Sequence, residues 1–144
     1  MNSTLIYSFR TNKYINYLNK AGIEVFVFGK LKEDFIKFQK LVERTRPELI
    51  IGLAEVKDKS KFETLAINIF GRDRKVNKNG KNSYPLHIPY KGIFQKSANS
   101  TKSFCNWTMY KISEIIDPKY TKVSFLHFNK KDLSEVFDFI KNMK

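Results

Sequence analysis

The stretch ELIIGLA, residues 48–54, becomes an unbroken apolar run of strand length after its first glutamate. Strands of a parallel sheet have this composition because helices cover both of their faces. Pro47 separates the run from the preceding helical pattern, since the residue before a proline avoids helical backbone angles. The stretch therefore predicts a central, doubly covered strand of an α/β sheet.

Strand and helix patterns alternate on both sides of this run. Residues 31–46 are the clearest helix, because apolar side chains recur every three or four residues and form one stripe: Leu31, Phe35, Phe38, Leu41 and Val42. Further strands are predicted at 4–9, 23–28, 62–70 and 122–128, and further helices at 11–22, 104–116 and 130–143. Residues 71–103 lack clear periodicity. The alternation predicts one domain, residues 1–144, a three-layer α/β/α sandwich with a mostly parallel, mixed sheet.

The length and composition fit one soluble domain. The 144 residues, 42% of them hydrophobic, can build one core of ordinary size. No apolar run approaches the roughly 20 residues of a membrane span, and the first ten residues lack the pattern of a secretion signal. We therefore expect a cytoplasmic protein without a membrane partner. One cysteine cannot form an internal disulfide, and two histidines without ligand spacing predict neither a metal site nor a cofactor.

A formal charge of +13 raises nucleic acid as a partner, because clustered cations displace counterions from phosphates. However, 22 lysines accompany only 5 arginines, and arginine is the residue that forks to phosphates and bases. Lysines on solvated helix faces and loops explain the charge better than a specific nucleic-acid surface. The densest basic segment, residues 72–84, contains a turn signal at Asn79 and Gly80 and is predicted to be a mobile loop.

Cys105, the only cysteine, stands in the first turn of the helix predicted at 104–116. Unpaired backbone N–H groups and the positive end of the helix dipole stabilise a thiolate there, and they lower the thiol pKa from its usual value of about 8.5. A thiolate is the nucleophile of cysteine enzymes, and the same N–H groups can receive an oxyanion. The alternative is a buried, unreactive cysteine that only fills the core.

A base and a carboxylate stand at suitable places in the predicted sheet. His127 lies near the end of the apolar strand 122–128, at the edge where parallel strands present working residues. Glu63 interrupts the apolar strand 62–70, where burying an unpaired carboxylate would be costly. Each has an ordinary alternative, namely a hydrogen-bonded core histidine and an exposed glutamate at a strand start. His87, in irregular chain, is the second candidate for the base.

Three stretches carry a resemblance to a known family: PELIIGLAEVKDKSKFETLAIN (47–68), SFCNWTMYKI (103–112) and VSFLHF (123–128). Together they resemble the pyroglutamyl peptidases, also called pyrrolidone-carboxyl peptidases. Chains of that family carry a G-Q-A strand end, an E-R-V-A-x-N strand, a C-N-x-x-x-Y helix and an H-[IV]-P strand end, in this order. The resemblance implies an α/β/α sandwich, and it places Glu63, Cys105 and His127 on the catalytic glutamate, cysteine and histidine.

Several pocket positions depart from the family pattern. Leu53 stands where the family has the glutamine of G-Q-A, and Arg72 is one residue early for the family's assisting arginine. Of an aromatic turn that holds the substrate's lactam ring, Phe9 remains to contact the ring and the second phenylalanine is missing. Asn129 stands where the family has the proline after its last strand, and the connections are shorter than in typical members. The resemblance therefore supports the class of activity better than the substrate.

The resemblance implies a cysteine peptidase that removes N-terminal pyroglutamate, so that the partner is a peptide with a blocked N-terminus. Cys105 would attack the amide carbonyl, backbone N–H groups of Cys105 and Asn106 would hold the oxyanion, and His127 would protonate the leaving amine. The alternative is an inactive relative that binds an acidic partner or nucleic acid, the latter through the basic segment. The sequence leaves a homo-oligomer open.

Overall fold

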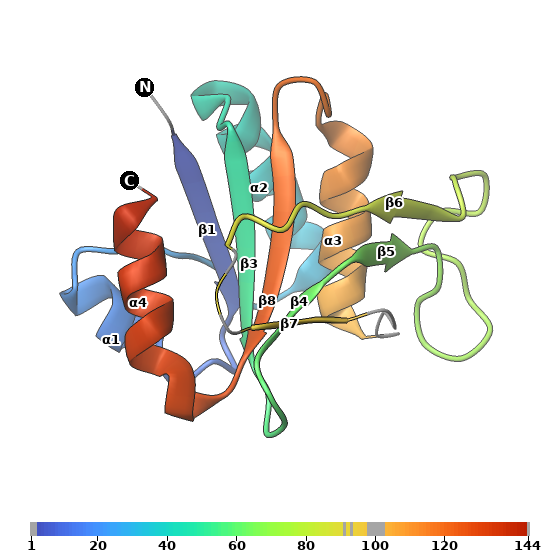
Figure 1. Ribbon diagram of the computed structural model, residues 1–144. Coiled ribbons are helices and arrows are strands. Elements are labelled where there is room, and N and C mark those ends of the chain that lie inside the picture. Colours follow the sequence, from blue (N-terminus) through green and yellow to red (C-terminus); the bar gives the residue numbers. More distant parts are fainter. Residues whose placement is uncertain (1–2, 91, 93, 98–102, 144) are drawn as a thin grey trace.

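The computed structural model describes residues 3–90, 92, 94–97 and 103–143. Its strands are β1 Thr4–Phe9, β2 Phe26–Phe28, β3 Leu49–Glu55, β4 Lys61–Glu63, β5 Leu65–Ile67, β6 Ser83–Pro85, β7 Gln95–Ser97 and β8 Lys122–Phe128. Its helices are α1 Ile15–Lys20, α2 Leu31–Thr45, α3 Phe104–Ile115 and α4 Leu133–Asn142, with a 3₁₀ turn, η1, at Lys130–Asp132. Six strands form one sheet in the order β2-β1-β3-β8-β4-β7, and β5 pairs with β6 separately (Figure 1).

β1, β3 and β8 form the centre of the sheet and run parallel to one another. β3 pairs along its whole length with β8, from Leu49 opposite Lys122 to Glu55 opposite Phe128, and its other edge pairs with β1. β4 joins the far edge of β8 in the antiparallel direction, so the sheet is mixed. The predicted central strand and the predicted α/β class with a mostly parallel, mixed sheet are confirmed.

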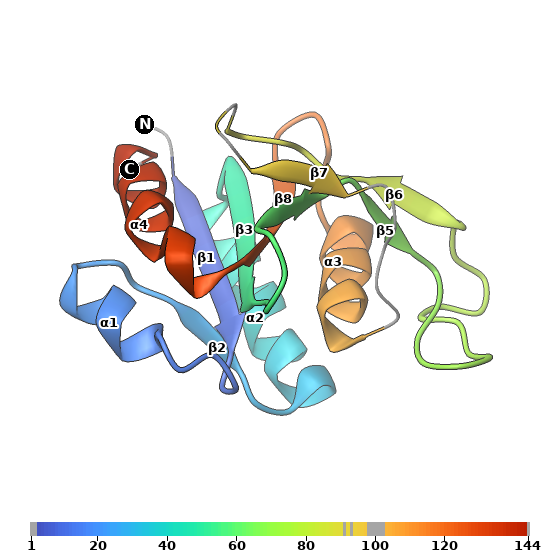
Figure 2. The ribbon, with the colours of Figure 1, turned by 60° about the horizontal axis from the view of Figure 1, so that its bottom comes forward.

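Helices cover both faces of this sheet (Figures 1 and 2). The face under α2 and α3, here the α2/α3 face, buries mostly aromatic strand residues: Tyr7, Phe9, Phe28 and Phe125. The face under α1 and α4, the α1/α4 face, buries mainly aliphatic residues of the central strands: Ile6, Ile51, Leu53 and Leu126. Successive residues of a strand point to opposite faces, so adjacent positions in β1, β3 and β8 enter different clusters.

Two long helices begin and end close to their predicted bounds. α2 ends at Thr45, and Arg46 takes a left-handed backbone conformation with φ of 46° before Pro47. α3 ends one residue before the predicted position. Within the described residues, no helix combines the length and the apolar character that crossing a membrane requires.

The first predicted helix and the second predicted strand are shorter than expected. Asn12 donates its N–H to the carbonyl of Phe9 and accepts the N–H of Tyr14 on Oδ1, so a turn occupies the first residues of the expected helix. At the other end, the N–H of Ile23 donates back to the carbonyl of Leu18. This closing turn belongs to α1, and it leaves only Phe26–Phe28 to pair with β1.

The single strand predicted at 62–70 is wrong, because the chain leaves the sheet at Thr64. β4 stays in the main sheet, whereas β5 pairs antiparallel with β6, and the carbonyl of Thr64 accepts the N–H of Leu86. β6 and β7 lie in the segment without periodicity, where strands of three residues give no recognisable pattern. The last predicted helix begins as η1, with the side chain of Asn129 accepting the N–H of Lys131.

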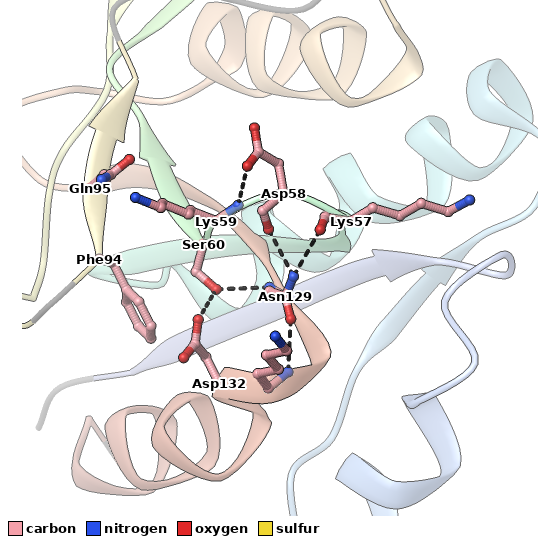
Figure 3. Close-up of a pocket in the computed structure, with 9 residues that line it drawn as sticks. Lys57, Asp58, Lys59, Ser60, Phe94, Gln95, Asn129 and Asp132 are labelled. Carbon is pink, nitrogen blue, oxygen red and sulfur yellow. Dashed lines mark hydrogen bonds between the residues drawn. The ribbon is translucent and has the colours of Figure 1, made fainter.

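Asn129 ties together two connections at the C-terminal edge of the central strands (Figure 3). Its Nδ2 donates to the carbonyls of Lys57 and Asp58, at 3.0 Å each. Its backbone N–H donates to Oγ of Ser60 at 2.7 Å, and its Oδ1 accepts the N–H of Lys131 at 2.9 Å. The β3–β4 connection and the start of η1 therefore share one hydrogen-bonded frame.

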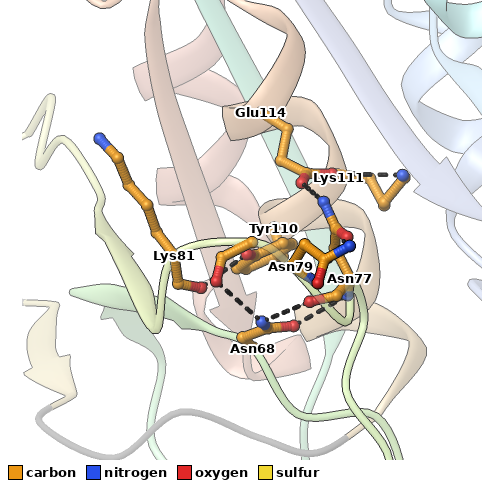
Figure 4. Close-up of polar contacts among 8 residues, drawn as sticks. Asn68, Asn77, Asn79, Lys81, Tyr110, Lys111 and Glu114 are labelled. Atoms are coloured by element: carbon orange, nitrogen blue, oxygen red, sulfur yellow. Dashed lines mark hydrogen bonds and ion pairs between the residues drawn. The ribbon is translucent and has the colours of Figure 1, made fainter.

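The basic segment is anchored, contrary to the prediction of a mobile loop (Figure 4). Asn68 exchanges two hydrogen bonds with the backbone of Asn77, at 2.7 and 2.9 Å. Nδ2 of Asn77 donates to Glu114 at 2.5 Å, and the hydroxyl of Tyr110 donates to the carbonyl of Lys81 at 2.6 Å. Side chains of α3 thus hold the loop, which sequence periodicity cannot indicate.

Candidate active site

Glu63 and His127 form a buried hydrogen-bonded pair on the α2/α3 face. The antiparallel register places Lys61 opposite His127, so Glu63 becomes the diagonal neighbour of His127 on the same face. Nδ1 of His127 lies 2.7 Å from Oε2 of Glu63, and the two side chains are 7% and 0% exposed. An ionised carboxylate can only accept, so this pairing favours the tautomer in which Nδ1 donates to Glu63 and leaves Nε2 of a neutral ring as the acceptor.

Cys105 is the second residue of α3, as the sequence predicts. Ser103 precedes the helix with an extended backbone, and its Oγ accepts the N–H of Cys105 at 3.2 Å. The carbonyl of Cys105 accepts the hydroxyl of Thr108 at 2.7 Å. The residue is buried, with 5% of its surface exposed.

The expected lowering of the thiol pKa is wrong. Burial raises the pKa of Cys105 to about 12, the hydrogen bond from Ser103 opposes this, and the negative charge of Glu63 raises the pKa further. Desolvation of the anion therefore outweighs the helix N-terminus. Cys105 rests as a neutral thiol at physiological pH.

Cys105 and His127 line the same small pocket. Its volume is about 250 Å³, and its lining comes from the C-terminal ends of β1, β3 and β8 and the start of α3: Phe9, Thr11, Asn12, Ala54, Glu55, Phe104, Cys105 and His127. The register sets Ala54 directly opposite His127. The C-terminal edge of parallel strands is where α/β proteins collect reactive residues, which agrees with this position.

Phe104 is a pocket residue that the sequence reasoning missed. Its ring lies 4.7 Å from the ring of Phe9 in an edge-to-face arrangement, and the residue is 39% exposed. It directly precedes Cys105, so its place at the first turn of α3 brings it to the pocket mouth. The sequence signal that could have identified Phe104 is its position as an aromatic residue directly before the candidate nucleophile.

Leu53 and Arg72 lie outside the pocket, and the side chain of Asn106 binds another strand. The side chain of Leu53 is fully buried on the α1/α4 face, because it alternates with Ala54 along β3. Arg72 is exposed in the basic segment and does not line the pocket. The amide of Asn106 holds β5, since it binds the N–H and carbonyl of Ile67 and the carbonyl of Ile69 at 2.8–2.9 Å.

His87, the second candidate for the base, belongs to a different pocket, beside the start of β8. Burial lowers its pKa, and the nearby charge of Lys122 lowers it further. Its backbone pairs with β8, because its N–H donates to the carbonyl of Val123 and its carbonyl accepts the hydroxyl of Ser124. In the part of the chain that the structure describes, no group of three or more histidine, cysteine, aspartate or glutamate side chains could hold a metal ion.

Comparison with known proteins identifies the fold. None of the known family models matches the chain, and no curated relative matches it. Among solved structures, pyrrolidone carboxyl peptidase from Thermococcus litoralis is 19% identical with a TM-score of 0.70, covering 90% of this chain and 77% of that one. Pyroglutamyl peptidase I from Bacillus amyloliquefaciens is 14% identical with a TM-score of 0.72, covering 99% and 93%.

Pyrrolidone carboxyl peptidase from Thermus thermophilus is similar to the same degree. It is 18% identical with a TM-score of 0.70, and the match covers 97% of this chain and 95% of that one. At such identities a structural likeness shows the fold alone. The chain has the fold of the pyroglutamyl peptidases.

Proposed function

We propose that this protein is a cysteine peptidase of the pyroglutamyl peptidase type, which removes an N-terminal pyroglutamyl residue from peptides. The observation that carries the proposal is the buried 2.7 Å hydrogen bond between Glu63 and His127, with His127 and Cys105 lining one pocket. The shared fold with pyroglutamyl peptidases supports the same class of reaction.

A neutral thiol requires a base at the moment of attack. Nε2 of His127 takes the proton of Cys105 as the sulfur bonds to the amide carbonyl carbon, and Glu63 stabilises the resulting imidazolium. His127 then gives this proton to the leaving amine as the C–N bond breaks. Water, deprotonated by the same imidazole, hydrolyses the thioester, releases pyroglutamate and restores the thiol.

The oxyanion would bind at the first turn of α3. The N–H of Cys105 already donates to Ser103, which weakens the expectation that it serves the oxyanion. The first N–H groups of a helix have no intrahelical acceptor, and this leaves the N–H of Asn106 as the better-placed donor. The amide side chain of Asn106 would keep this turn fixed against β5.

The pocket suits a small flat ring at the scissile residue. Phe9 and Phe104 supply apolar walls, and the volume of about 250 Å³ is sufficient for a five-membered lactam ring. A lactam has no cationic amine, so it enters an apolar pocket at lower desolvation cost than a free N-terminus.

A second candidate function follows from the raised pKa of Cys105. A thiol that stays neutral and 5% exposed is also typical of a core cysteine, and the same fold could then act as a binding module without catalysis. The test below separates the two functions.

The experiment uses a fluorogenic pyroglutamyl amide, with the matching prolyl amide as control substrate. Release from the pyroglutamyl amide is expected at neutral pH, and Cys105→Ala and His127→Ala should each lower kcat/KM by about 10³-fold or more. Circular dichroism confirms that the variants fold. No release by the folded wild-type protein, or equal release by Cys105→Ala, would leave the binding module as the better proposal.

A further inference from the structure

Two further pockets extend from the active-site pocket along the C-terminal edge of the sheet. The first, of about 470 Å³, shares Glu55 with the active-site pocket and is otherwise lined by Lys13, Val56, Lys57, Asn129, Lys130 and Lys131. The second, of about 480 Å³, shares Lys57, Asn129 and Lys131 with the first and adds Lys59 and Ser60 among its lining residues. The shared residues place the two further pockets next to each other, and Glu55 places the first of them next to the active-site pocket that Cys105 lines.

These two further pockets, here called the lysine groove, are strongly basic next to the active-site pocket. Its first part is lined by four exposed lysines, Lys13, Lys57, Lys130 and Lys131, and by one carboxylate, Glu55. Within the described residues, none of these lysines has a carboxylate within ion-pair distance. Nζ of Lys13 lies 5.5 Å from the centroid of the Tyr14 ring, and the ammonium groups of the other three lysines are available to a ligand.

The second part of the lysine groove adds Lys59 and two carboxylates that other groups engage (Figure 3). Oδ1 of Asp58 accepts the N–H of Lys59 at 2.8 Å, and Oδ2 of Asp132 accepts the hydroxyl of Ser60 at 2.5 Å. Both donors are neutral and leave the carboxylates charged, but five lysines still face three carboxylates in the lining of the two pockets, so the net charge of the groove is positive.

A network of hydrogen bonds fixes the backbone segments that carry the groove lysines. Asn129 holds the carbonyls of Lys57 and Asp58 and the N–H of Lys131, and Ser60, 4% exposed, links the same frame to Asp132 (Figure 3). The backbones that carry Lys57 and Lys131 are thus fixed relative to each other, while their long side chains reach solvent. A fixed backbone lowers the ordering cost of binding an extended ligand.

We propose that the lysine groove binds acidic residues of the peptide substrate on the C-terminal side of the pyroglutamyl residue. This rests on the proposed function, because the pyroglutamyl ring would fill the closed pocket and the rest of the peptide must leave it. The groove adjoins that pocket at the shared lining residue Glu55, so the departing chain can reach it. The substrate class is therefore pyroglutamyl peptides with aspartate or glutamate in the residues that follow.

The lining favours an acidic peptide over nucleic acid. Among the described residues that line the groove, the five lysines are accompanied by no arginine, and the one aromatic residue, Phe94, is 8% exposed and packs edge-on against Phe62. Single-stranded nucleic acids are held by exposed aromatic faces as well as by charge. An extended peptide with several carboxylates can be bound by the positive charge of lysines alone, without aromatic faces.

The first test compares two hexapeptide amides of equal length, pyroglutamyl-Ala-Asp-Glu-Asp-Glu and pyroglutamyl-Ala-Lys-Ser-Lys-Ser. Wild-type kcat/KM at low salt should be roughly tenfold higher for the acidic peptide, and 0.5 M NaCl should remove most of the difference. The double variant Lys57→Glu/Lys131→Glu should lower the ratio of kcat/KM for the acidic peptide to that for a pyroglutamyl amide by about tenfold. Lys40→Glu/Lys119→Glu, which changes two exposed lysines outside the groove, should leave this ratio unchanged. An equal preference for both peptides, or the same ratio in both double variants, overturns the proposal.

A binding test separates this proposal from the proposed function. Fluorescence anisotropy of the labelled acidic hexapeptide on the Cys105→Ala protein measures affinity without any turnover. Tighter binding of the acidic than of the basic peptide, lost in Cys105→Ala/Lys57→Glu/Lys131→Glu, supports the lysine groove even when the wild-type protein hydrolyses nothing. Stronger binding of a single-stranded RNA oligonucleotide that displaces the peptide overturns it in favour of nucleic acid.

Discussion

Both faces of the sheet bury their side chains deeply, but one face carries polar, ionisable residues and the other carries apolar residues. On the α2/α3 face, Glu63 and His127 are hydrogen-bonded to each other beside Cys105. On the α1/α4 face, their chain neighbours Phe62 and Leu126 pack only against apolar side chains. A shift of one residue along β8 would exchange His127 for Leu126, so strand register decides which face can carry chemistry. The predictions that follow test what each face tolerates.

The largest effect is expected from Glu63→Gln. The amide preserves the shape but removes the charge that stabilises the imidazolium of His127, and it favours the wrong ring tautomer. Hydrolysis of a pyroglutamyl amide should fall in kcat by about 10² to 10⁴, measured by steady-state kinetics. Phe62→Leu on the opposite face is the control, and its kcat should change by less than threefold. A kcat within threefold of wild type in Glu63→Gln would remove the carboxylate from the mechanism.

The second prediction concerns the pH dependence of Cys105 alkylation. A raised folded-state pKa favours the neutral thiol below that pKa, so the rate with iodoacetamide should climb with pH and stay far from its plateau at pH 9. At pH 7 the rate should lie about 10²-fold or more below that of the unfolded protein, and His127→Ala should lower it little further. A plateau reached below pH 8 would instead mean a resting thiolate, and the face would be more polar than its burial implies.

The raised pKa of Cys105 also makes the free energy of unfolding depend on pH. The unfolded thiol ionises near its ordinary pKa, whereas the folded thiol stays protonated to about 12. The contribution of Cys105 to stability is therefore complete below about pH 8 and is lost as the pH rises toward the folded-state pKa. Urea titrations of wild type and Cys105→Ala should converge in stability across this alkaline range.

Sequence reasoning found the parts of the fold that long periodic segments specify. β1, β3, β8, α2 and α3 lie within a residue or so of their predicted bounds, because each buries a full stripe or a whole strand. Among the three-residue strands, the prediction makes β2 too long, merges β4 with β5 and misses β6 and β7. At Thr64 the pairing changes partners without a change in composition. Such short strands are stabilised by tertiary hydrogen bonds, which no local pattern records.

In the candidate active site, too, sequence patterns identify some features and only the packing of the fold determines the others. Glu63, Cys105 and His127 could be chosen from the sequence, because polar residues at the ends of apolar elements are conspicuous. Leu53 was assigned to the pocket from a matching motif, and only the alternation along β3 shows that its side chain points to the other face. The direction of the Cys105 pKa shift depends on how completely α3 is covered, and this is a property of packing alone.

Packing on the α2/α3 face can be tested at Gly52. A Cβ added there would lie 2.4 Å from the ring of Phe125 and 2.5 Å from the ring of Tyr7, so these rings need a glycine beneath them. Gly52→Ala should lower the free energy of unfolding by about 1–3 kcal/mol, measured by urea titration. Leu53→Met, one position along and on the α1/α4 face, should cost less than about 1.5 kcal/mol. Equal costs would mean that the two faces are packed with similar freedom.

The smallest effect is expected where the α2/α3 face reaches solvent, at Phe104. Its edge-to-face contact with Phe9 forms the apolar wall of the pocket, and contacts between aromatic rings are worth about 0.5–1.5 kcal/mol beyond burial. Phe104→Leu should therefore raise KM for the pyroglutamyl amide by roughly two- to tenfold, with kcat nearly unchanged if the ring binds ground state and transition state alike. Ile36→Ala is the matched control, because Ile36 is exposed at 57% on α2 and lines no part of this pocket. A KM that moves equally in both variants would mean that Phe104 acts through general surface hydrophobicity, and Phe9 alone would then define the apolar wall.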